Sequence, residues 1–183
     1  TRGEESDVFG GQFVCGALTA DAWKGKWITA DEDSGQRALY FRRDFRIEKE
    51  LSGACLFVSG IGYHKVTVNG MDADDAVMDP AFSDYNKTCY YAVLPNVGEL
   101  LEQGDNCIGI TVAPGWRNNP DEQLTIVNGG KEPEIFGAPA LNAQLHLFYS
   151  DGTKQCLCTD EKWKWKYGAI TYAHVFNGET YDA

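Results

Sequence analysis

The sequence predicts an all-β protein, an antiparallel, jelly-roll-like β-sandwich with one short helical turn. Three observations lead to this prediction. Apolar and polar residues alternate with a period of two in many short stretches, turn-forming residues separate these stretches at intervals of about 8–12 residues, and only one segment has a helical signature. Side chains of a β-strand point alternately to opposite faces, so a period of two indicates a strand with one face on a core.

The predicted strands follow one another along the chain with turn residues between them. The clearest is residues 141–147, where apolar residues alternate with Asn, Gln and His as in a half-buried strand. Glycine-containing turns at residues 60–62, 69–70 and 151–152 supply positions that tolerate a positive φ. The other predicted strands are residues 39–47, 54–59, 63–69, 88–94, 107–112, 124–127 and 154–159.

The single helical turn is predicted to follow Asn96. The Asn96 side chain can cap the free backbone amides of a turn that includes residues 99–102. Gly104 then ends the turn, because glycine readily adopts the backbone conformation that terminates helices.

Length and charge restrict the classes of partner. A chain of 183 residues can bury one core without disulfides or a structural metal. Its 16 Lys and Arg against 27 Asp and Glu give a net charge of −11, which repels nucleic acid and anionic membrane surfaces. No stretch approaches the roughly 20 apolar residues of a membrane-spanning helix. We therefore expect a globular domain with neither nucleic acid nor membrane as a partner.

The expected domain organisation is an N-terminal segment or linker over residues 1–22 and a sandwich domain over residues 23–183. The chain begins with Thr1, lacks a signal-peptide pattern, and ends shortly after a strand-like stretch. These features indicate a domain excised from a longer protein.

Cysteine usage favours the cytoplasm over an oxidising compartment. The six cysteines are scattered through apolar stretches and form no C-x-x-C motif, so we expect buried free thiols. Two of them are separated by one residue and should share a strand face. The six are Cys15, Cys55, Cys89, Cys107, Cys156 and Cys158.

Sequence signatures of enzymes are missing. There is no G-x-S-x-G, H-E-x-x-H, Walker or G-x-G-x-x-G motif, and His64, His146 and His174 are interpreted as structural. Carboxylate pairs alone do not indicate a glycosidase, because 27 acidic residues supply many pairs by chance. The acidic segment at residues 72–75 could bind calcium, but it lacks EF-hand spacing, which favours a solvated loop.

Two loop segments combine aromatic and polar side chains. Trp116 lies in a Pro- and Gly-containing turn after the predicted strand 107–112, and Arg117, Asn118 and Asn119 follow it. A Trp face can cover the apolar surface of a sugar ring while Arg and Asn bond its hydroxyls; alternatively, Trp116 caps the core. Burying about 100 Å² would contribute only about 2.5 kcal/mol, so binding would be weak.

The second segment, residues 80–86, carries Asp84 and Tyr85. Its aromatic rings could wall a cleft or close an end of the sandwich.

Several segments in order resemble the amino-terminal β-domain of bacterial α-L-rhamnosidases, over about residues 23–183. The matching segments are WI at 27–28, LYFRRDF at 39–45, VSGIGY at 58–63 with VNG at 68–70, DPAFSDY at 79–85, NCIG at 106–109, GW at 115–116, YSDG at 149–152, TDEKW at 159–163 and NGETYDA at 177–183. One departure is Phe82, where the family often has Trp.

The resemblance implies a jelly-roll β-sandwich that precedes a separate α/α-toroid catalytic domain, which hydrolyses terminal L-rhamnose from glycosides. In such enzymes the catalytic carboxylates belong to the toroid, so no residue of this chain inherits a catalytic role. Some related β-domains bind L-rhamnose with calcium, and others only support the enzyme. Two hypotheses follow. One is a non-catalytic accessory domain that binds L-rhamnose weakly, and the other is a structural module that packs on the catalytic domain. In the first, the sugar-binding residues are Trp116, Arg117, Asn118, Asn119, Asp84 and Tyr85.

Overall fold

The computed structural model describes residues 14–17, 19–31, 34–85, 87–116 and 137–183, and it confirms the predicted antiparallel all-β sandwich. One sheet has the strand order β1-β8-β3-β6, with β9 also paired to β8. It comprises β1 (Ile28–Thr29), β3 (Leu51–Ile61), β6 (Ala92–Leu94), β8 (Ala140–Tyr149) and β9 (Lys154–Cys158). We call this the first sheet.

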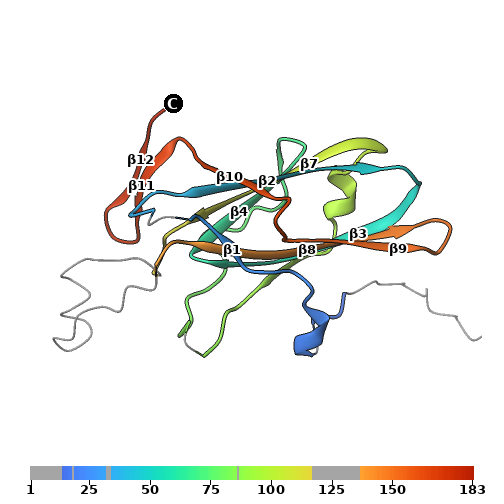
Figure 1. Ribbon diagram of the computed structural model, residues 1–183, viewed down its shortest axis with the longest axis horizontal. Helices are drawn as coiled ribbons and strands as arrows, with labels where there is room; N and C mark the ends of the chain where they lie inside the picture. The colour runs from blue at the N-terminus through green and yellow to red at the C-terminus, as the bar shows by residue number, and fades with distance from the viewer. Residues whose placement is uncertain (1–13, 18, 32–33, 86, 117–136) are drawn as a thin grey trace, which may run out of the picture.

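The second sheet has the order β10-β2-β7-β4-β5. It comprises β2 (Leu39–Ile47), β4 (Tyr63–Val68), β5 (Met71–Asp72), β7 (Gly104–Ala113) and β10 (Lys164–Tyr167). A separate hairpin of β11 (Ile170–His174) and β12 (Gly178–Tyr181) stands at one end of the sandwich (Figure 1). Among the described residues, two short stretches are 3₁₀ helices, η1 (Ala20–Ala22) and η2 (Val97–Leu100).

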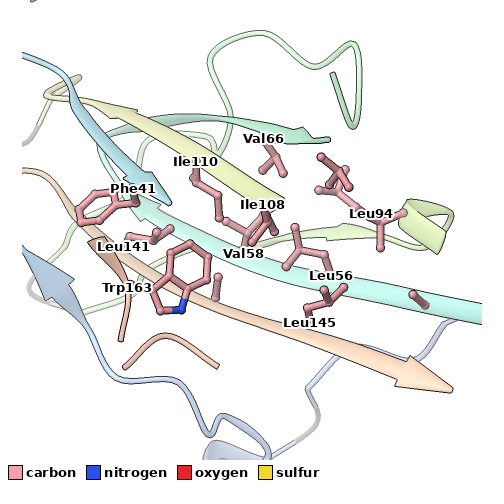
Figure 2. Close-up of a cluster of buried hydrophobic side chains, with 14 of the residues drawn as sticks. Phe41, Leu56, Val58, Val66, Leu94, Ile108, Ile110, Leu141, Leu145 and Trp163 are labelled. Atoms are coloured by element: carbon pink, nitrogen blue, oxygen red, sulfur yellow. The ribbon is translucent and has the colours of Figure 1, made fainter. Parts of the chain in front are cut away.

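The hydrophobic core lies between the two sheets. The inward-facing residues of β2, β4 and β7 alternate with exposed or half-buried ones, as their period-two pattern predicts. Figure 2 shows labelled side chains of both sheets pointing toward one another, with the Trp163 ring among them. Trp163 and the half-buried Trp165 both contribute to this core, and the Trp163 indole N–H donates to the Cys158 carbonyl at 3.0 Å. An aromatic ring with a bonded polar group can be buried at little penalty.

The prediction that residues 141–147 form a half-buried strand is wrong in one respect. The strand exists as β8, but Asn142 and Gln144, on the face away from the core, are 6% and 2% exposed. The reason is a covering segment, residues 14–17 and 19–27, which we call the N-terminal strap. Figure 1 shows the strap running along the side of the first sheet that faces away from the second.

Hydrogen bonds attach the strap to β8 and to the residue that follows β9. The Lys24 amide donates to Gln144 Oε1 at 2.9 Å, and Gln144 Nε2 donates to the Ala22 carbonyl at 3.2 Å. Asn142 Nδ2 donates to the Gly25 carbonyl at 3.1 Å. Thr159 makes two hydrogen bonds with Lys26. The Thr159 carbonyl accepts from the Lys26 amide at 2.9 Å, and the Thr159 hydroxyl donates to the Lys26 carbonyl at 2.6 Å. These bonds satisfy polar groups that would otherwise be buried without partners.

Other predicted elements differ in detail. Only Ala92–Leu94 of the predicted strand 88–94 is a strand, because the Tyr90 and Thr88 carbonyls accept from the hydroxyls of Ser59 and Ser83 instead of a sheet partner. The predicted side-chain cap at Asn96 is wrong, since the Glu99 amide bonds the Asn96 backbone carbonyl. The predicted strand 124–127 lies outside the described residues, and the strands β1, β5, β10, β11 and β12 were not given bounds in the sequence-based prediction.

The close approach of the strap predicts a specific sensitivity at Gly25. A Cβ there would lie 2.2 Å from Asn142 Oδ1 and 2.9 Å from the Ala143 carbonyl oxygen, both of which belong to the sheet. Gly25→Ala should therefore lower the free energy of unfolding by about 1–3 kcal/mol, the usual effect of overpacking. Urea denaturation measures it.

Gly53→Ala is the matched control, because a Cβ on this β3 glycine meets nothing within 4 Å. Its unfolding free energy should stay within about 1 kcal/mol of wild type. Equal losses in the two variants would contradict the close packing of the strap.

Candidate functional site

Four aromatic rings from three separate segments meet at the end of the sandwich that carries the β11–β12 hairpin. The Trp116 ring lies 5.3 Å from that of Phe82 and 5.5 Å from that of Phe176, and the Phe82 and Tyr85 rings are 5.9 Å apart. We call Phe82, Tyr85, Trp116 and Phe176 the end cluster. The structure thus brings together the two loop segments that the sequence analysis singled out.

Trp116 is positioned by the turn that follows β7. Gly115 has φ +55°, and a Cβ there would lie 3.2 Å from Tyr63 Cδ2, so glycine permits the turn to lie against the start of β4. Burial raises the pKa of Tyr63, and a hydrogen bond between the side chains of Tyr63 and Trp116 partly offsets this rise. Trp116 is half-buried in this environment, with Phe82 and Phe176 beside it.

The loop that carries Phe82, Asp84 and Tyr85 is attached to β4 through His64. The His64 amide donates to the Asp79 carbonyl at 2.7 Å, and His64 Nε2 lies 3.6 Å from Asp79 Oδ2. Within the loop, the Ser83 hydroxyl donates to the Thr88 carbonyl at 2.6 Å. These contacts determine which part of the loop reaches Trp116.

The predicted sugar-binding residues have different outcomes. Trp116 and Tyr85 belong to the end cluster, whereas Asp84 pairs with Lys87 at 2.9 Å on the exposed surface beside it. Hydrogen bonding to the Asp84 carboxylate raises the pKa of Lys87. Arg117, Asn118 and Asn119 lie outside the described residues.

The β11–β12 hairpin supplies aromatic residues that sequence reasoning missed as site residues. The ring of Tyr172 stacks on that of His174 at 6.1 Å, and His174 lies 6.0 Å from Phe176. His174 Nδ1 accepts hydrogen bonds from the amides of Phe176 and Asn177, both at 3.2 Å, which is a structural role in the turn. The available signal was the period-two spacing of Tyr172, His174 and Phe176.

The acidic loop is organised around a lysine. Lys65 Nζ donates to the Asp74 carbonyl at 2.6 Å and lies 3.5 Å from Asp72 Oδ2 and 3.7 Å from Asp74 Oδ1. An ammonium group therefore occupies the centre where a calcium ion would need the oxygens. Within residues 14–17, 19–31, 34–85, 87–116 and 137–183, no three His, Cys, Asp or Glu side chains converge to hold a metal ion. The acidic loop, as Lys65 organises it, does not fit calcium.

The six cysteines are free thiols, but the prediction that they are buried is wrong for most of them. Only Cys55 is buried, and burial raises the pKa of its thiol to about 11. Cys15 and Cys156 are exposed because they lie on the strap and on β9, the outer edge of the first sheet. As expected, Cys156 and Cys158 share a face, with their sulfur atoms 3.3 Å apart.

In the described part of the chain, no helix has the length and apolar character needed to cross a membrane.

Comparisons with known proteins agree with this architecture. Residues 49–183 match the family model of the α-L-rhamnosidase N-terminal domain. The chain is 31% identical over 201 residues to an α-L-rhamnosidase of Formosa agariphila, covering 93% of this chain and 20% of that protein. It therefore spans about a fifth of the length of this curated relative.

Two solved structures are similar over most of the chain. One is the native α-L-rhamnosidase of Aspergillus terreus, with a TM-score of 0.80 and 30% identity, over 90% of this chain and 19% of that one. The other is the α-L-rhamnosidase of Streptomyces avermitilis complexed with L-rhamnose, with a TM-score of 0.72 and 30% identity. That match covers 80% of this chain and 14% of the Streptomyces chain.

The buried His64 predicts a loss of stability in mild acid. Burial lowers the pKa of His64 below its ordinary 6.5, although Asp79 and Asp74 oppose this, and neither ring nitrogen has a hydrogen-bond partner. Below about pH 6.5 the unfolded chain binds a proton that the folded chain does not, so the free energy of unfolding falls as pH decreases. The slope from this residue is at most about 1.4 kcal/mol per pH unit.

Urea denaturation between about pH 7.5 and 5.5, on wild type and His64→Leu, measures this slope. His146, whose pKa burial also lowers, titrates in both proteins and cancels in the difference. The variant should lose less stability than wild type on acidification. Identical slopes would show that His64 is not held neutral.

Proposed function

The chain belongs to the family of α-L-rhamnosidase N-terminal domains, and from this premise we propose that it is a non-catalytic accessory domain of a larger α-L-rhamnosidase. Its partner in the same polypeptide would be the catalytic domain, and the substrate of the whole enzyme would be a carbohydrate that contains L-rhamnose. Residues 23–183 would form the accessory domain, and residues 1–22 the segment that precedes it. Ala17 and Ala22 of that segment contact the first sheet and Tyr91 through hydrogen bonds.

The environment of the acidic residues supports a non-catalytic role. Glycoside hydrolysis requires two carboxyl groups on opposite sides of one glycosidic bond, one of them able to donate a proton. Beside the end cluster, Asp84 is paired with Lys87 and Asp79 lies against His64. In the acidic loop, Asp72 and Asp74 surround Lys65. These carboxylates are thus engaged with Lys and His side chains of the domain itself.

The observation that carries the binding proposal is the end cluster itself. Phe82 and Phe176 are 56% and 49% exposed, so the rings beside Trp116 present apolar surface to the solvent. Aromatic rings pack against the C–H face of a sugar, and a contact of about 100 Å² contributes about 2.5 kcal/mol. We therefore propose weak binding of L-rhamnose units at Trp116 and Tyr85, with Asp84, Arg117, Asn118 and Asn119 supplying polar contacts. The related Streptomyces enzyme, which was crystallised with L-rhamnose, supports this ligand.

A structural role is the second candidate function. The loop beside the end cluster also exposes Val77 by 84% and Met78 by 55%. Contiguous exposed apolar side chains are typical of protein contacts as well as of ligand sites. In this alternative the same surface packs against the catalytic domain, and free sugar has no effect on it.

Titration of the chain with methyl α-L-rhamnoside tests the binding proposal. The indole N–H signal of Trp116 should shift in ¹H–¹⁵N spectra at tens of millimolar sugar, and Trp116→Ala should weaken the affinity by about tenfold or more. Tyr181→Ala is the control, because it removes a 65%-exposed ring from β12 and leaves the end cluster intact. Calcium addition should change neither result, because the Lys65 ammonium group occupies the centre of the acidic loop.

The same titration separates the two candidate functions. An unperturbed Trp116 signal at tens of millimolar rhamnoside would refute sugar binding at this end. Burial of the Trp116 indole against the catalytic domain, measured by solvent quenching of its fluorescence in the two-domain protein, would then support the structural role.

A further inference from the structure

A hollow lies on the outer face of the first sheet, between the N-terminal strap and the loop that leads to β6. Its volume is about 190 Å³. It is lined by Trp23, Trp27, Ser59, Cys89, Tyr91 and Asn142. None of these residues belongs to the end cluster, so the hollow is a separate feature of the molecule.

Aromatic rings form its walls. Trp23 and Trp27 come from the strap, and Tyr91 comes from the loop just before β6. The Trp23 and Tyr91 rings meet edge to face, with centroids 5.2 Å apart and planes at 81°, and Phe57 contacts both at 6.5 and 6.1 Å. The Tyr91 hydroxyl also accepts the Ala17 amide at 3.0 Å. These contacts fix the Trp23 ring against the Tyr91 ring, while the Trp27 ring remains 45% exposed.

Two polar side chains form the floor. Ser59 of β3 and Asn142 of β8 are direct cross-strand partners, and they are only 4% and 6% exposed. The Ser59 hydroxyl donates to the Tyr90 carbonyl, and Asn142 Nδ2 donates to the Gly25 carbonyl. A hydroxyl that donates once can still accept, and an amide nitrogen carries two hydrogens. The floor can therefore offer an acceptor and a donor to a ligand that enters between the rings.

The lining indicates the chemical class of the ligand. It contains no charged side chain, and the protein carries a net charge of −11, so phosphates and other anions are disfavoured. The volume equals that of roughly six water molecules at about 30 Å³ each, and it is below the usual range for extended ligands. A pyranose ring has this size, an apolar C–H face for the indoles, and hydroxyls for a serine–asparagine pair.

We propose that this hollow, bounded by Trp23, Trp27 and Tyr91 over the Ser59–Asn142 pair, binds a single neutral pyranose unit of a glycan. The site does not depend on sugar binding at the end cluster. If both sites bind, one glycan chain could be held at two points of the domain.

Two-dimensional NMR on the ¹⁵N-labelled chain tests the proposal, because each of the five tryptophans reports separately through its indole N–H. The probes are methyl α-L-rhamnoside and methyl β-D-glucoside, each to tens of millimolar. The Trp27 and Trp23 signals should shift with at least one of them. Trp27→Ala should weaken that binding by about tenfold, and Ser59→Ala should weaken it by a smaller factor.

The matched control is Trp116→Ala, which removes an indole from the end cluster and should leave the Trp27 titration unchanged. Trp27→Phe keeps an aromatic wall and should retain part of the affinity, so it tests the site even if the alanine variant is poorly folded. Absence of a Trp116 shift alone would refute sugar binding at the end cluster and would leave the proposal for the hollow standing.

Three results would overturn the inference. One is the absence of Trp23 and Trp27 shifts with both glycosides. Another is wild-type affinity for the glycoside in both Trp27→Phe and Ser59→Ala, measured from the signals of the other residues that line the pocket. The third is binding of p-nitrophenol with no binding of either methyl glycoside, which would assign the pocket to a flat aromatic ring.

Discussion

Hydrogen bonds between the first sheet and the N-terminal strap are the interaction on which the rest of the structure depends. Asn142, Gln144 and Thr159 are almost fully buried on the side of β8 and β9 that faces away from the core. An amide or hydroxyl in such a place is costly unless it is bonded, and here the backbone of residues 22–26 supplies the partners. Polar side chains on the outer face of this sheet are therefore buried under the strap and hydrogen-bonded to it, whereas the side chains between the two sheets make apolar contacts.

This constraint also arranges the surfaces that meet ligands. Bonds to Ala22, Lys24, Gly25 and Lys26 fix the backbone between Trp23 and Trp27, so the two indoles reach the hollow above the Ser59–Asn142 pair in one position. The end cluster is positioned by a different part of the fold, the start of β4 and the turn after β7. The two candidate surfaces share the loop between β5 and β6, which carries Phe82 and Tyr85 at one and Tyr91 at the other.

The sequence predicted the fold where a single face contacts the core. Leu39–Ile47 was predicted to the residue, because its alternation matches the burial of β2. Period-two alternation did not predict the burial of the outer face of β8. A polar residue at an outward position looks the same in the sequence whether it faces water or bonds a covering segment of backbone. The Asn96 side chain was predicted to cap the helical turn, but the Glu99 amide donates to the Asn96 backbone carbonyl instead. Trp116 and Tyr85 were both predicted to bind sugar, whereas Phe176 was missed because only the tertiary structure brings the hairpin to Trp116.

Hydrogen exchange at the Lys24 and Lys26 amides tests the central claim most directly. Both amides donate to acceptors on the sheet, Gln144 Oε1 and the Thr159 carbonyl. If the strap is part of the folded unit, they exchange only on global unfolding, at the rate of the slowest β3 and β8 amides. Exchange of these two amides near the rate of an unstructured peptide, while β8 stays protected, would show that the strap opens independently and would contradict the account.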